Sequence, residues 1–109
     1  ATLTGSIELT ANSQENIQKT PLQATMSSKT LSFPAEFNKD NTIVLFVGFR
    51  KTSDKGFNYG WNNYASSSDF VRGTMPYDIT VGPNGIIMRL GNFSSSSTNF
   101  EYKLILMKI

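Results

Sequence analysis

The tetrapeptide Gly82-Pro83-Asn84-Gly85 restricts the fold of this chain more than any other short stretch. Two apolar segments flank it, Tyr77–Val81 with alternating polar residues and Ile86–Leu90. Glycine, proline and asparagine favour tight turns, and a tight turn between two such segments is typical of an antiparallel hairpin. The sequence therefore predicts a β-hairpin over residues 77–90.

Three further segments have the pattern of strands. Thr2–Thr10 alternates between apolar and polar residues, as does the shorter Lys29–Phe33, and both predict half-buried strands. Thr42–Phe49 is continuously apolar, which predicts a central strand or a strand with one face against another subunit. In contrast, Ala11–Asn16 reads as a polar connection. Ile17–Met26, interrupted by Pro21, gives at most an edge strand.

The final segment, Phe100–Ile109, has two apolar faces. Its first face carries Phe100, Tyr102, Leu104 and Leu106. Its second face becomes apolar near the end of the chain, at Ile105, Met107 and Ile109. When a strand is apolar on both faces, the second face has to be covered from water. A subunit interface or a loop of the same domain can cover it equally well. We predict an oligomer interface at Ile105, Met107 and Ile109.

Length and composition fit one all-β domain spanning residues 1–109. The chain is large enough for a single core, and serine, threonine and asparagine make up about a third of it. Turn-forming residues recur about every ten positions, which is typical of an antiparallel sandwich or barrel. We expect an antiparallel β-sandwich, jelly-roll-like, of seven to nine short strands.

Several classes of function lack the residues that they need. There is no cysteine or histidine, which excludes a Ser-His-Asp triad and argues against zinc or copper sites. The eight carboxylates are scattered along the chain, so no acid and base pair can be assigned. We expect no enzyme activity, no cofactor and no metal. The ten basic residues are also spread out, and no apolar run reaches transmembrane length, so we expect neither nucleic-acid binding nor membrane insertion.

The most distinctive polar stretch is Gly56–Tyr64, which holds the only tryptophan, with asparagine and glycine between the aromatic residues. Aromatic rings beside amide and carboxylate groups suit a ligand that is polar yet partly apolar, such as a sugar. The same run also fits a strand whose alternate rings, beginning with Phe57, face the core. The candidate saccharide-binding residues are Tyr59, Trp61, Asn62, Asn63, Tyr64, Asp69 and Arg72.

Two other stretches resemble a known family. Lys29–Pro34 followed by Phe37–Val44, and the ending Asn99–Ile109, are similar to segments of the small β-domains that close phage tail-fibre and baseplate proteins of Gram-positive hosts. They cover about a quarter of the chain and carry no functional chemistry. The resemblance implies a homotrimeric receptor-binding head, forming the C-terminal fragment of a longer fibre protein and binding cell-surface glycan.

The sequence therefore favours a module that binds a cell-surface saccharide at the virion tail tip or in another extracellular setting. Two alternatives remain. One is a structural domain that trimerises or caps a fibre or appendage without its own ligand. The other is a lectin or carbohydrate-binding module of a secreted protein.

Overall fold

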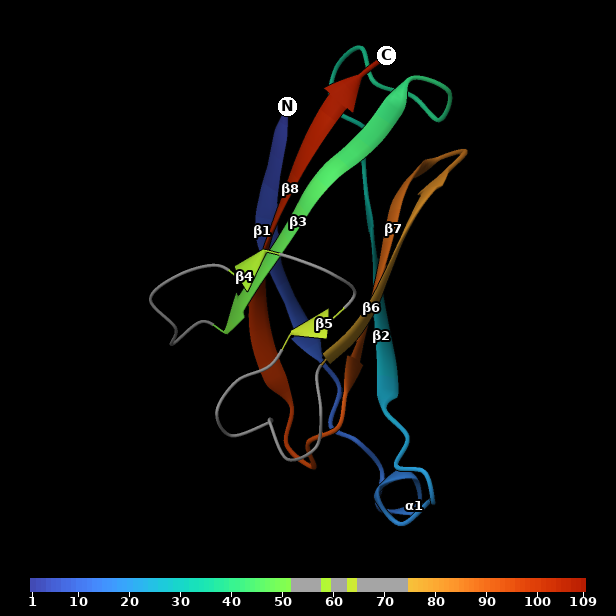
Figure 1. Cartoon of the computed structure of the whole chain (residues 1–109), viewed down its shortest axis with the longest axis vertical. Coiled ribbons are helices and arrows are strands. Elements are labelled where there is room, and N and C mark those ends of the chain that lie inside the picture. Colours follow the sequence, from blue (N-terminus) through green and yellow to red (C-terminus); the bar gives the residue numbers. More distant parts are fainter. Residues whose placement is uncertain (52–57, 60–62, 65–74) are drawn as a thin grey trace.

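The strands form two antiparallel sheets (Figure 1). The computed structural model describes residues 1–51, 58–59, 63–64 and 75–109. The first sheet has the order β1 (Thr2–Leu9), β8 (Thr98–Lys108), β3 (Thr42–Lys51) and β4 (Asn58–Tyr59). The second has the order β2 (Thr25–Leu31), β7 (Gly85–Asn92), β6 (Met75–Gly82) and β5 (Asn63–Tyr64). The prediction of an all-β fold with antiparallel strands is confirmed.

The two sheets face each other and share one hydrophobic core. Strand β8 supplies four buried side chains, from every second residue between Phe100 and Leu106, as its alternation predicted. The second sheet supplies four more, from Leu31 of β2 and from β7. The buried hydrophobic residues of the described chain are Ile7, Leu9, Leu31, Phe49, Ile86, Met88, Leu90, Phe100, Tyr102, Leu104 and Leu106.

The predicted hairpin is present as β6 and β7. The two strands close on the pair Gly82 and Gly85, with Pro83 and Asn84 between them. A Cβ atom on Gly85 would lie 2.5 Å from the carbonyl oxygen of Leu31 in β2, and the φ of Gly85 is +155°. Only glycine allows so close an approach of a neighbouring strand. The turn residue therefore also fixes how β2 joins the sheet.

The segment between β1 and β2 differs from its predicted structure. Gln14–Ile17 forms a one-turn helix, α1, where a polar connection was expected. Ser13 caps it, because its side-chain oxygen accepts a hydrogen bond from the backbone N–H of Asn16 at 3.0 Å. The weak edge strand expected over Ile17–Met26 was wrong over most of that range, since β2 begins only at Thr25.

Hydrogen bonds of Asn12 connect the helical segment to the rest of the domain. The residue is 5% exposed, and its side chain donates a hydrogen bond to the carbonyl oxygen of Gln23 at 2.8 Å. Its Oδ1 accepts a hydrogen bond from the hydroxyl of Thr25 at 2.6 Å. Its backbone N–H donates to the carbonyl of Ser94 at 2.7 Å. One buried amide thus joins three separate segments of the chain.

Asn92 makes similar hydrogen bonds in the serine-rich connection between β7 and β8. Its amide nitrogen donates to the carbonyl oxygens of Thr10 and Ser96, both at 3.0 Å. Its oxygen accepts from the N–H of Ser94. The serine-rich turn is therefore hydrogen-bonded to a buried side chain.

Strand β3 is irregular where its sequence is most apolar. Val44 pairs with Leu106 and Phe46 with Ile105, so the register shifts between Val44 and Phe46. The extra residue, Leu45, makes this a β-bulge. Both Val44 and Val47 pack against the core, although they are three residues apart.

Candidate functional site

The outer face of the first sheet is divided into a charged half and an apolar half. Residues opposite each other in neighbouring strands share a face, so the pairing register gives the order of side chains across it. In the charged half, Glu101 of β8 stands between Ser6 of β1 and Arg50 of β3. One row along, Lys103 stands between Thr4 and Gly48. Three strands thus bring polar side chains from distant parts of the sequence together.

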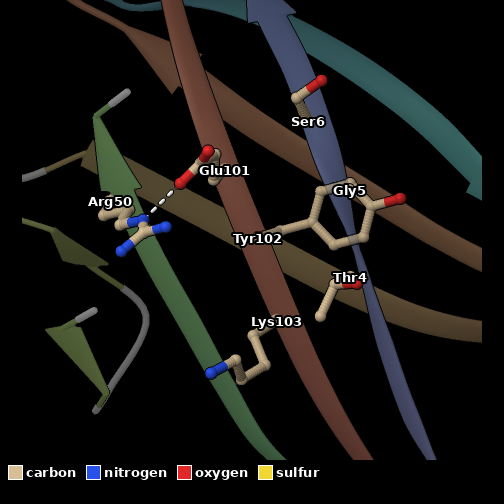
Figure 2. A pocket seen from close by; sticks show the side chains of 7 residues that line it. All are labelled: Thr4, Gly5, Ser6, Arg50, Glu101, Tyr102 and Lys103. Carbon is tan, nitrogen blue, oxygen red and sulfur yellow. Dashed lines mark hydrogen bonds and ion pairs between the residues drawn. The ribbon is translucent and has the colours of Figure 1, made fainter. Parts of the chain in front are cut away.

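These residues line a shallow hollow of about 480 Å³, which we call the sheet hollow (Figure 2). Figure 2 shows that β1, β8 and β3 all contribute side chains to it. Its lining residues are Thr4, Gly5, Ser6, Arg50, Glu101, Tyr102 and Lys103.

An ion pair between Arg50 and Glu101 forms one side of the sheet hollow. The Arg50 Nε donates to Glu101 Oε2, and the two side chains point toward one another. Their side chains are 30% and 31% exposed, so each is about two-thirds covered by protein. Partial burial strengthens a charge-assisted hydrogen bond and reduces its screening by salt. The pair therefore holds a carboxylate and a guanidinium in fixed positions at the rim.

Behind the sheet hollow, on the core side of the first sheet, Tyr102 packs against Gly5. A Cβ atom on Gly5 would lie 2.6 Å from Cζ of Tyr102 and closer still to its hydroxyl oxygen, so the ring occupies the space that a side chain would need. The Lys29 ammonium lies 5.4 Å from the centroid of the same ring and donates to the carbonyl oxygen of Ser6 at 2.7 Å. The tyrosine is therefore held in one position by β1 and β2.

The apolar half of the same face begins directly beside the sheet hollow. In the next row Ile105 pairs with Phe46, and beyond it Met107 pairs with Ile43. Phe46 is 57% exposed, a high value for a phenylalanine in a sheet. We call this surface the apolar patch, and its residues are Ile43, Leu45, Phe46, Ile105 and Met107.

The three residues predicted for an oligomer interface lie in or beside the apolar patch. Met107 and Ile109 are exposed, whereas Ile105 is half-buried among its neighbours. The sequence did not single out the β3 residues of the patch, because a continuously apolar strand gives no sign of which side chains face outward. The pairing with β8 supplies that information.

The predicted saccharide residues are only partly within the described chain. Tyr59 belongs to β4, where it pairs with Gly48 of the first sheet. Asn63 and Tyr64 form β5, which pairs with β6 of the second sheet. Trp61, Asn62, Asp69 and Arg72 lie outside the described residues, as does Phe57. The structure thus places the backbone of three of the seven.

Within the described residues, no group of three or more histidine, cysteine, aspartate or glutamate side chains could hold a metal ion. In that same part of the chain, no helix has the length and apolar character to cross a membrane. Comparisons with known protein families, with curated proteins and with solved structures found no match. The function must therefore be argued from the surface itself.

Proposed function

We propose that this domain is a non-catalytic module that recognises a cell-surface saccharide through its aromatic stretch. The observation that supports this most is the position of that stretch in the fold. It contains β4, on the edge of the first sheet, and ends with β5, on the edge of the second. Both strands belong to the part of the chain that links β3 to β6, and segments that link the strands of a rigid scaffold commonly carry binding residues.

The proposed architecture is a jelly-roll-like sandwich that forms a trimeric head at the tip of a phage tail fibre or baseplate protein. The resemblance of the β2–β3 region and of β8 to such heads supports it. The apolar patch supports the oligomer, since exposed contiguous apolar surface commonly marks a contact between proteins. Phe46 and Met107 would then lie between subunits.

Saccharide binding is tested with a glycan array and with purified bacterial cell walls. The wild-type domain should bind a restricted set of glycans, and Trp61→Ala should abolish binding while the far-UV circular dichroism spectrum stays unchanged. Absence of binding by the wild type, or full binding by a folded Trp61→Ala variant, would refute the proposed site.

The oligomer is tested by light scattering and analytical ultracentrifugation. Phe46→Ser and Met107→Ser, each made singly, should shift the domain from trimer to monomer. Met26→Ser is the matched control, because Met26 is 49% exposed on β2 of the other sheet. A monomeric wild type would count against the fibre head and favour a carbohydrate-binding module of a secreted protein.

A second candidate function is a structural domain that trimerises or caps a fibre without its own ligand. The apolar patch favours it, because association through this surface needs nothing from the aromatic stretch. A trimeric domain that binds no glycan or cell wall would support this function over the first.

A further inference from the structure

We propose that the sheet hollow is a second saccharide site, which binds a pair of neighbouring hydroxyl groups on one sugar ring. The inference rests on the proposed function, because the class of ligand, a saccharide, is taken from it. It assigns part of the binding to residues that lie outside the aromatic stretch, on the face of the first sheet.

The lining of the sheet hollow offers both hydrogen-bond donors and acceptors to a diol. Each sugar hydroxyl can donate one hydrogen bond and accept others. The Glu101 carboxylate accepts hydrogen bonds only, whereas the Arg50 guanidinium and the Lys103 ammonium only donate. A carboxylate beside a guanidinium therefore complements two adjacent hydroxyls, one donating and one accepting.

The spacing also fits one sugar ring. Strands in a sheet lie about 4.8 Å apart, so side chains from β1, β8 and β3 span roughly 10 Å across the face. A hydroxyl of Thr4 or Ser6 on one side and the ion pair on the other can then contact opposite edges of the same ring. The backbones of β1 and β8 that carry these groups are held on the core side by the packing of Tyr102 against Gly5. The groups are held by strands rather than by loops, which limits the entropy lost on binding.

The experiment is a titration of the ¹⁵N-labelled domain, followed by NMR, with a panel of methyl glycosides of hexoses, deoxyhexoses and N-acetylhexosamines. At least one glycoside with a vicinal diol should shift the backbone amides of Thr4, Ser6, Glu101 and Lys103. Cyclohexanol, which has one hydroxyl, should not shift them.

Two variants test the contacts. Glu101→Gln removes the charged acceptor and should weaken binding about tenfold or more, since hydrogen bonds to charged groups are the stronger ones. Thr4→Val removes a hydroxyl with little change in shape and should weaken binding severalfold. Glu15→Gln in α1 and Thr30→Val in β2 are the matched controls and should leave the affinity unchanged.

The indole N–H signal of Trp61 separates the two proposals. If a glycoside shifts that signal but none of the four amides, the sheet hollow is not a saccharide site and the proposed function stands. If no glycoside of the panel shifts the four amides, or if Thr4→Val and Glu101→Gln bind as tightly as wild type, the inference is overturned. Shifts of the four amides that are lost in Glu101→Gln but kept in Trp61→Ala would support a separate site.

Discussion

Replacing Asn12 with alanine should destabilise the domain more than any exposed polar substitution. The residue is 5% exposed, and its side chain makes five hydrogen bonds, to Ser13, Asn16, Gln23, Thr25 and Phe93. Alanine leaves the Thr25 hydroxyl and the Gln23 carbonyl without these partners. Each buried unsatisfied polar group costs about 1–3 kcal/mol, so we expect a loss of roughly 2–4 kcal/mol in the free energy of unfolding.

Urea denaturation followed by circular dichroism measures this loss. Gln14→Ala is the control, because Gln14 is exposed at the start of α1, and it should change the free energy of unfolding by less than about 0.5 kcal/mol. If Asn12→Ala costs no more than Gln14→Ala, the buried amide does not hold these segments together and the reasoning fails.

Asn12→Asp gives a second measurement with a defined pH dependence. The variant keeps the acceptor for Thr25, but it places a carboxylate against the carbonyl oxygens of Gln23 and Phe93. Burial and these carbonyls should raise its folded-state pKa above the unfolded value of about 3.9. The protonated acid can donate a hydrogen bond, so this variant should gain stability relative to wild type as the pH falls through the raised pKa. A constant difference between pH 7 and pH 4 would contradict this account.

Three further outcomes follow from the described contacts. Gly5→Ala should cost about 1–3 kcal/mol in urea denaturation by displacing the Tyr102 ring, and far less in a Tyr102→Leu background. Lys29→Met should cost about 1–2 kcal/mol by removing its hydrogen bond to a β1 carbonyl and its position over the Tyr102 ring; a cost below about 0.5 kcal/mol would refute this. Burial raises the pKa of the Tyr77 phenol. The contribution of the neutral phenol to the free energy of unfolding is therefore complete below the unfolded-state pKa of about 10, and it is lost as the pH rises through the folded-state pKa. Ultraviolet absorbance should show a tyrosine that ionises above pH 10, and Tyr77→Phe should remove that step.

The sequence was sufficient to predict the position of a residue where that position depends only on strand alternation or on a local turn. The inward positions of β8 and the turn at Pro83 and Asn84 depend only on alternation and on turn chemistry within a few residues. Both predictions are confirmed. The apolar second face of β8 was visible for the same reason.

Features that depend on register between distant segments could not be predicted. Asn12 reads as an ordinary loop residue, because its partners at Gln23 and Phe93 come close only after the sheets pack. The sheet hollow depends on the pairing of Arg50 with Glu101. This pairing exists because the bulge in β3 shifts the register of β3 against β8 by one residue. Single-sequence patterns contain no information about such a shift.

The bulge at Leu45 also bears on which changes of chain length the domain tolerates. Removing one residue from a regular strand turns every later side chain to the opposite face of the sheet. Deleting Leu45 would instead leave Val44, Phe46 and Val47 in strict alternation, with both valines toward the core and Phe46 outward as before. At this position the strand can therefore lose a residue and keep its buried face, so chains one residue apart in length share the same core.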